Sequence, residues 1–114
     1  DTPWPKLTLA RQGLADSLAK GNWPQLALAV MRQPCLDVND QALPDTGVGL
    51  TLERQLAPPF IVGETYGTRA TTWLEWHRNG HLELGERRFG ANASNLGETN
   101  LSVSTELWDS TLQA

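Results

Sequence analysis

Two glutamates and two histidines stand in mirrored order on either side of an Asn-Gly pair, as Glu75, His77, His81 and Glu83. Imidazole nitrogens and carboxylate oxygens are ligand types that zinc accepts. All four side chains share one face if the two segments pair as a hairpin with a three-residue loop. A solvated hairpin face would carry the same residues, and closed zinc sites are usually built from more than one hairpin. The sequence therefore favours a solvated face, and we assign no metal ligand and no cofactor from it.

The register of this hairpin follows from the apolar residues beside it. The Asn-Gly pair is a strong hairpin signal, but a two-residue loop there would put the apolar residues of the two strands on opposite faces. A three-residue loop over residues 78–80, with its glycine in the left-handed conformation, instead pairs Trp76 with Leu82. It also pairs Leu74 with Leu84 on the same face. The other face then holds the two glutamates side by side and the two histidines side by side.

Residues 43–49, Leu-Pro-Asp-Thr-Gly-Val-Gly, form a glycine-rich loop. Its glycines let backbone N–H groups approach a ligand, and Asp45 and Thr46 offer side chains that can hydrogen-bond it. A turn that leads into a helix would have the same composition. The loop is therefore a candidate binding segment, with the structural alternative open.

A second candidate segment opens the first hairpin strand, where Tyr66, Thr68 and Arg69 surround a glycine. A guanidinium beside hydroxyl groups can hold a carboxylate, a phosphate or a carbonyl. An ion pair at the start of a strand would account for the same arginine.

Cys35 is the one cysteine of the chain, and it lies between Pro34 and Leu36 with no histidine nearby in the sequence. A reactive thiolate needs a positive or helix N-terminal setting that nothing in this segment indicates. We therefore assign no catalytic residue and expect a buried structural cysteine. The tryptophans Trp4, Trp23 and Trp76 are likewise expected to serve packing.

The elements that must position these residues follow from periodicity and from the turn residues. Leu7, Ala10, Leu14 and Leu18 recur at helical spacing after an opening rich in proline. Gly21 ends this helix, and a tight turn leads into the next. The remaining elements are a helix over 23–32, an ordered loop over 33–49, a short helix over 51–57 and a hairpin over 67–89.

Composition limits the class of protein. The chain has 114 residues, one domain's worth, and its 9 Lys+Arg against 13 Asp+Glu give a net charge of −4. That balance argues against a nucleic-acid partner, because phosphate binding depends on clustered Lys and Arg. The longest apolar run, Leu26 to Met31, is far short of the roughly 20 residues of a membrane span. A single cysteine suits an intracellular chain, so we expect a cytoplasmic location.

Five segments occur together in an order and spacing that resemble a known family. They are residues 1–6, 43–49, 59–61, 66–69 and 86–89. The chain resembles the C-terminal half of the NRDE family, also called the transport and Golgi organisation family. Five linked segments are much more specific than any one of them.

This resemblance implies an α+β fold that is the C-terminal portion of an N-terminal-nucleophile-hydrolase-like αββα sandwich. Its elements are a helical hairpin, the glycine-rich loop, a short helix and an antiparallel β-hairpin. The family's Met-Cys opening and Asn-Arg-Asp-Glu motif lie in the N-terminal half, and neither is present in this chain, which opens at Asp1. We expect residues 1–90 to be the C-terminal half of an NRDE-like domain. Residues 91–114 are expected to be a polar tail or a weak edge strand.

The resemblance also implies functional residues and partners. By position it carries over Asp45, Thr46, Tyr66, Thr68 and Arg69 as substrate-binding residues. It implies amide or acyl hydrolase activity in the intact protein, with a cysteine nucleophile that this chain lacks. The alternative is a non-enzymatic binding or trafficking protein for haem or acyl lipids, in which this piece completes the sandwich. The expected partners are the missing N-terminal half and a small acyl or amide ligand or haem, and the fragment alone is expected to self-associate.

Overall fold

The computed structural model describes residues 2–105, which fall into two compact units. The helical unit comprises residues 2–68 and 91–93, and the sheet unit comprises residues 69–90 and 94–105. Helices and an antiparallel sheet together confirm the α+β class and the predicted order of elements. None of the helices in the described part of the chain has the length and apolar content that a membrane span needs. The predicted boundary between domains at residue 90 stays a prediction.

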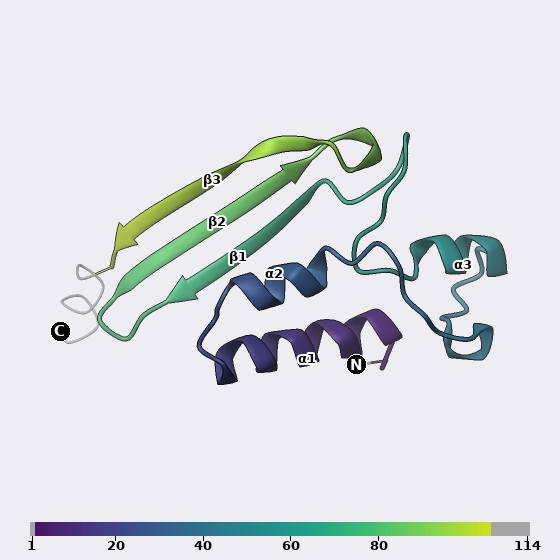
Figure 1. Cartoon of the computed structure of the whole chain (residues 1–114), viewed down its shortest axis with the longest axis horizontal. Coiled ribbons are helices and arrows are strands. Elements are labelled where there is room, and N and C mark those ends of the chain that lie inside the picture. The colour runs from purple at the N-terminus through teal and green to yellow at the C-terminus, as the bar shows by residue number, and fades with distance from the viewer. Residues whose placement is uncertain (1, 106–114) are drawn as a thin grey trace. The chain divides into compact units, whose positions relative to one another are not determined.

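The helical unit begins with an antiparallel pair, α1 (Pro5–Ala19) and α2 (Gln25–Met31), which lie side by side (Figure 1). Proline suits the first turn of α1 because that turn has no partner for its N–H groups. Gly21 turns the chain with a φ of 67°, as predicted. The helices pack closely at Gly13, where an added Cβ would lie 2.7 Å from Val30 Cγ2.

The buried face of α1 differs from the predicted leucine stripe. Gly13 and Ser17, one turn apart, are the buried residues of α1, whereas Leu14 and Leu18 are exposed. Small residues at this spacing let two helix backbones approach each other, and a leucine in the same place would separate them. Apolar periodicity alone therefore selected the wrong face of this helix.

Residues 33–49 form the expected ordered loop, with one 3₁₀ turn, η1 (Asp40–Ala42). The side chain of Asn39 caps this turn by accepting a hydrogen bond from the N–H of Ala42. Arg54 donates from Nε to Asp40 Oδ1 at 2.9 Å, which ties the turn to the next helix.

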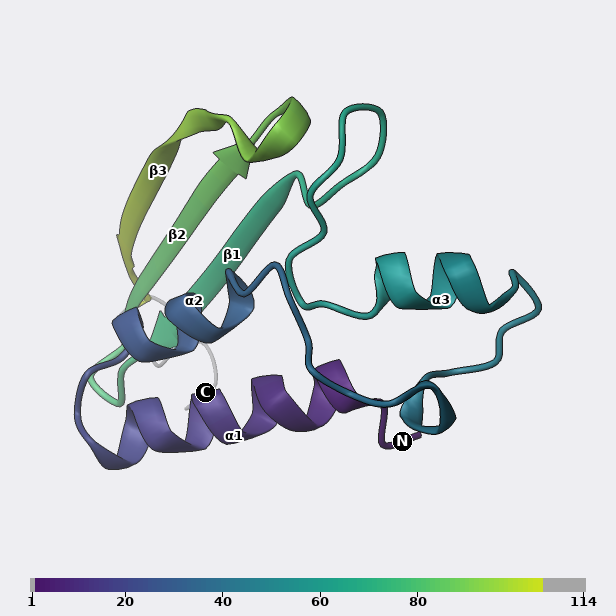
Figure 2. The ribbon, with the colours of Figure 1, turned by 45° about the vertical axis from the view of Figure 1, so that its right-hand side comes forward.

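Helix α3 (Leu50–Leu56) follows this loop, within one residue of its predicted bounds. Gly49 stands at its start with a φ of 87°, a conformation that favours glycine. Figure 2 shows α3 and η1 near the N-terminal end of α1. The glycine-rich loop is thus the turn that leads into α3.

The sheet unit contains three antiparallel strands in the order β1 (Ala70–Trp76), β2 (His81–Phe89) and β3 (Asn95–Ser104) (Figure 1). Trp76 pairs with Leu82 in the predicted register, and Gly80 has a φ of 83°. The three-residue loop is therefore confirmed. Within the region 91–114, residues 95–104 form an edge strand, and residues 106–114 lie outside the described part.

The two faces of the sheet differ in character. One face carries two apolar rows, each with one residue from every strand: Leu74, Leu84 and Leu101, and Trp76, Leu82 and Val103. Trp76 is 62% exposed, so the expectation that packing accounts for this tryptophan is wrong for the chain as it stands. On the other face the Trp73 ring lies over Gly85, where an added Cβ would be 2.0 Å from the ring.

Candidate functional site

A cavity of about 130 Å³ lies in the helical unit, between the start of α1, the loop over residues 33–49 and the end of α3. Most of its wall is apolar, and the apolar lining residues are Trp4, Pro5, Leu36, Leu43, Pro44, Leu56 and Ala57. Small-molecule sites in proteins are typically apolar hollows with a few placed polar groups. This cavity has that character, so its polar groups determine what it can bind.

Glu53 supplies the carboxylate of the cavity wall, and its residue is only 6% exposed. Its Oε1 accepts two hydrogen bonds from Thr46, one from the hydroxyl at 2.6 Å and one from the backbone N–H at 2.7 Å. These two hydrogen bonds lower the pKa of Glu53, and the bond from the hydroxyl has the larger effect. Burial acts in the opposite direction and raises the pKa, whereas the positive charge of Lys6 lowers it slightly further. The cavity therefore contains a fixed, ionised carboxylate.

Lys6 supplies the positive charge of the cavity wall. Its Nζ donates to the carbonyl oxygen of Leu56 at 2.9 Å, which ties the start of α1 to the end of α3. A cation is also favourable at the C-terminal end of a helix, where carbonyl groups lack intrahelical partners. Lys6 thus closes the cavity and leaves ammonium N–H groups for a ligand.

The loop around the cavity is held in place by the pair of Arg54 and Asp40. The hydrogen bond from Arg54 is the main cause that lowers the pKa of Asp40, and the same pair raises the pKa of Arg54. Both side chains are about half exposed, so the pair adds little to the stability of the fold. Its main effect is to hold the loop against α3.

The two predicted residues of the glycine-rich loop have different surroundings. Thr46 lines the cavity and positions Glu53. Asp45 is exposed and makes no hydrogen bond or ion pair with the residues that the structure describes. The glycines at 47 and 49 have φ values of 89° and 87°, which serve the turn into α3.

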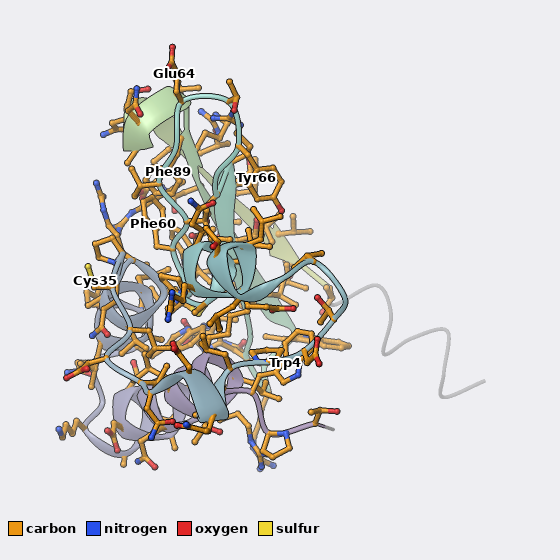
Figure 3. The ribbon with its side chains drawn as sticks, turned by 90° about the vertical axis from the view of Figure 1, so that its right-hand side faces the viewer. Trp4, Cys35, Phe60, Glu64, Tyr66 and Phe89 are labelled. Atoms are coloured by element: carbon orange, nitrogen blue, oxygen red, sulfur yellow. The ribbon has the colours of Figure 1, made fainter. Side chains whose placement is uncertain are left out.

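Tyr66 and Thr68 share a loop that is closed by two hydrogen bonds. The Ile61 N–H donates to Thr68 Oγ1 and the Thr68 N–H donates to the Ile61 carbonyl, both at 2.9 Å. Tyr66 is 65% exposed and lines an open groove of about 600 Å³ beside α3. Figure 3 shows Glu64 at the tip of this loop and Tyr66 nearer its base. Thr68 therefore has a structural role here, and Tyr66 is available to a ligand.

Arg69 is an exposed residue of the sheet unit, and its carbonyl accepts a hydrogen bond from the Phe89 N–H at 2.8 Å. No hydrogen bond or ion pair within residues 2–105 joins the predicted residues of the glycine-rich loop to those of the 61–68 loop. Their assignment as substrate-binding residues stays a prediction, and Thr46 and Tyr66 each line a hollow.

Sequence reasoning missed Glu53 and Lys6 as polar groups of the cavity. Lys6 belongs to the opening segment that carries the family resemblance, so that segment contained the signal. Glu53 is one of two charged residues on a short helix, and only its hydrogen bonds with Thr46, seven residues earlier, distinguish it.

Cys35 is exposed, so the expectation of a buried cysteine is wrong. Figure 3 shows its sulfur pointing outward from the chain that follows α2. Pro34 ends the helical region just before it, and the extended loop that follows does not cover the thiol.

Helices that enclose an apolar cavity, followed in the chain by an antiparallel sheet, define an α+β protein with the features of a small-molecule binding site. A family model described as Transport and Golgi organisation 2 matches residues 1–91. The chain therefore belongs to this family, which is the family that the NRDE resemblance indicated. A search of curated proteins found no match.

Proposed function

We propose that this chain binds the acyl part of a small acyl or amide ligand in the cavity, as the ligand-binding part of a Transport and Golgi organisation 2 family protein. The observation that supports this function is an apolar wall that holds one ammonium and one carboxylate. We place this binding in the cytoplasm, because a chain with one cysteine does not depend on an oxidising compartment.

The size of the cavity limits the ligand. An apolar cavity of about 150 Å³ in another protein binds benzene, and the cavity here is of similar size at about 130 Å³. It therefore accepts a short acyl chain or the end of a longer one. Haem does not fit, since sites for ligands of that size have volumes of roughly 300–1,000 Å³.

The polar groups favour a carboxylate or an amide as the head of this ligand. Lys6 uses one ammonium N–H on the Leu56 carbonyl, and its other donors suit a carboxylate or a carbonyl oxygen. The ionised Glu53 is an acceptor only, so it suits an amide N–H. An acyl amide satisfies both groups, whereas a plain hydrocarbon satisfies neither.

The test is calorimetric titration of the chain with carboxylates and primary amides of increasing length, from butyrate to decanoate. We expect saturable binding that strengthens with length and then levels off once the cavity is full. Lys6→Met should weaken carboxylate binding about tenfold, because a charge-assisted hydrogen bond is lost. Ala57→Leu should abolish binding, because it fills the cavity.

The chain offers a matched control for the lysine variant, because Lys20 lies at the other end of α1 and is exposed. Lys20→Met should leave the affinity unchanged. Equal losses in Lys6→Met and Lys20→Met, or undiminished binding by a folded Ala57→Leu chain, would contradict the proposal.

Amide or acyl hydrolysis is the chemistry that the family resemblance implies for the intact protein, and an acyl cavity suits it. Cysteine attack requires a thiolate with a base within reach and donors for the oxyanion. Within residues 2–105, Cys35 has neither a hydrogen bond nor an ion pair, and it does not line the cavity. We therefore propose that this chain holds the ligand and that the nucleophile lies in the N-terminal half of an N-terminal-nucleophile-hydrolase-like protein. Turnover of acyl nitroanilides by this chain, lost in Cys35→Ser, would overturn that division of roles.

The groove beside Tyr66 favours haem binding as a second candidate function. Its volume of about 600 Å³ is within the range for such ligands, its wall includes Phe60 and Val62, and tyrosine is one of the residues that ligate haem iron. Haem titration followed by visible absorption should give a saturable Soret shift that Tyr66→Phe removes. An unchanged spectrum in both chains would dismiss this candidate and leave the cavity proposal intact.

We also propose that the apolar face of the sheet is where the missing N-terminal half packs. Leu74, Trp76, Leu101 and Val103 on this face are all more than half exposed, which is unusual for adjacent apolar residues on a monomer. Without that half the chain should self-associate, as measured by light scattering after gel filtration. Leu101→Glu should give a monomer, whereas Thr99→Glu, on the same strand and face but outside the apolar rows, should not. A wild-type chain that is monomeric at high concentration would argue against this face as an interface.

A further inference from the structure

The polar face of the β1–β2 hairpin brings together the four side chains that the sequence places around its turn. Glu75 pairs directly with Glu83 across the two strands, and the His77 N–H donates to the His81 carbonyl at 2.8 Å. We refer to these four residues as the Glu/His cluster. All four lie on one hairpin of the sheet unit, so the cluster is complete within that unit.

The donor atoms of the Glu/His cluster converge. One ligand atom each from Glu75, His77 and Glu83 lies within 4.8 Å of the other two. His77 Nε2 is 3.4 Å from Glu75 Oε1, and His81 Nε2 is 3.1 Å from Glu83 Oε1. The two imidazole ring centroids are 5.6 Å apart, so His81 lies beside His77, although its ligand atoms are outside the group formed by the other three residues.

These spacings match what a zinc ion requires. Nitrogen and oxygen ligands lie about 2.0–2.2 Å from zinc in a tetrahedral site, which places neighbouring ligand atoms roughly 3.4 Å apart. Each side of the hairpin holds an imidazole nitrogen and a carboxylate oxygen at close to that separation, 3.4 Å between His77 and Glu75 and 3.1 Å between His81 and Glu83. Glu75, His77 and Glu83 thus offer three ligands that already lie close together, and a side-chain rotation of His81 would add the fourth.

Electrostatics in the sheet also favour a cation at this place. Like charges directly opposite each other on neighbouring strands are destabilising, and Glu75 and Glu83 have that relation. The other glutamates of the described sheet each pair with an arginine, Glu98 with Arg87 and Glu86 with Arg88. Among residues 2–105, the two glutamates of the cluster have ion pairs only with its histidines. A divalent ion would supply the positive charge that arginine supplies elsewhere.

We propose that the Glu/His cluster binds one Zn²⁺ per chain. The side chains are 37–53% exposed, so the ion can enter and leave without any rearrangement of the strands. Ser102 on β3 makes a contact of 3.1 Å with His81 Nε2 and so limits the rotation of that ring. Imidazole and carboxylate ligands favour zinc over magnesium and calcium, which bind oxygen ligands in larger sets.

The test is titration of the tag-free full chain with ZnCl₂ in metal-free buffer, by calorimetry and by thermal unfolding. We expect one ion per chain, a higher melting temperature with zinc, and no such effect from Mg²⁺ or Ca²⁺. Co²⁺ in place of zinc should give the visible absorption of a tetrahedral nitrogen and oxygen site.

Matched variants localise the ion. His77→Gln and Glu83→Gln should each weaken binding at least about tenfold, whereas Glu86→Gln, on the opposite face of β2, should not. Cys35→Ser should bind zinc like the wild type, which excludes the exposed thiol as the site. Circular dichroism of each variant separates a lost ligand from a lost fold. Unchanged binding in folded His77→Gln, or one ion for every two chains, would overturn a site within one hairpin.

Discussion

In the helical unit, two carboxylates beside the cavity are held by hydrogen-bond donors, since Thr46 holds Glu53 and Arg54 holds Asp40. In the described part of the sheet unit, Glu75 and Glu83 face each other and have only histidines as ion-pair partners. The apolar residues differ in part, since some of those in the helical unit enclose a cavity, whereas two adjacent apolar rows of the sheet form an exposed face.

This difference shows which part of each unit is still open to a ligand or partner. A polar group that already has its hydrogen bonds gains little from a further one, whereas an unpaired charge or an exposed apolar row gains much. The helical unit keeps a small apolar cavity and an open groove beside Tyr66. The sheet unit keeps an exposed apolar face and the Glu/His cluster.

The largest effect is expected from Gly63→Ala in the loop closed by Thr68. An added Cβ would lie 2.3 Å from the backbone oxygen of Tyr66, and a backbone atom cannot move aside as a side chain can. We expect a loss of about 3 kcal/mol in the free energy of unfolding, as for other overpacked sites. Urea unfolding measures it, with the exposed Thr65→Ala in the same loop as a neutral control. A loss no greater than that of the control would show that this loop is not part of the cooperative unit.

Gly85→Ala in the sheet should cost less, about 1–2 kcal/mol. Its Cβ would lie 2.0 Å from the Trp73 ring, but that ring is a side chain and can swing away. Moving it also loses the contact with the Arg87 guanidinium, 5.6 Å from the ring centroid.

A double-mutant cycle tests the cause of this loss. In a Trp73→Ala background, Gly85→Ala should be neutral or stabilising, because alanine suits a strand better than glycine. An equal loss in both backgrounds would place the clash somewhere other than the tryptophan ring.

The sheet register could be predicted because one apolar pattern excluded the alternative loop. A slip of one residue in one strand would move all its side chains to the other face of the sheet. The requirement that Leu74 and Leu84 share a face therefore selects the observed register. The buried face of α1 could not be predicted, since Gly13 and Ser17 pack by being small and give no hydrophobic signal. The exposure of Cys35 depends on the path of a loop, which the sequence does not specify.

The cavity was only partly accessible from the sequence. Thr46 was chosen for its place in a glycine-rich loop, but its partner Glu53 is set by how that loop folds back on α3. The Glu/His cluster shows the opposite case. The register alone predicts that its four residues share one face of the hairpin. The distances between their ligand atoms depend on side-chain conformations, which the sequence does not specify.

A smaller effect is expected at Glu53, and it should depend on pH. Its pKa is lower in the folded chain than its ordinary value near 4.5, so the stability it contributes is fully present above that pH. This contribution is lost as the pH falls through the lower folded-state pKa. Thr46→Val removes the hydroxyl bond, which is the main cause of the shift. Urea unfolding from pH 7 to pH 3 should therefore show wild type and variant converging at low pH.

The control for that experiment is Thr51→Val, an exposed threonine at the start of α3. Its difference from the wild type should not change with pH. A constant gap between the Thr46→Val and wild-type curves would mean that Thr46 stabilises the loop by packing and not through the ionised carboxylate.

The smallest effect is expected from Glu98→Gln on β3, and it tests whether a lowered pKa predicts stability in both units. The hydrogen bond from Arg87 is the main cause that lowers the pKa of Glu98, with a smaller contribution from Asn100. Both members of the pair are more than a third exposed, so water and salt screen the interaction. Urea unfolding at pH 7 should place Glu98→Gln within error of the wild type, whereas Glu53→Gln, a buried site, should be measurably less stable. Equal losses at the two sites would mean that the edge strand is held as firmly as the cavity wall, and that the contrast between the units lies in their unfilled surfaces alone.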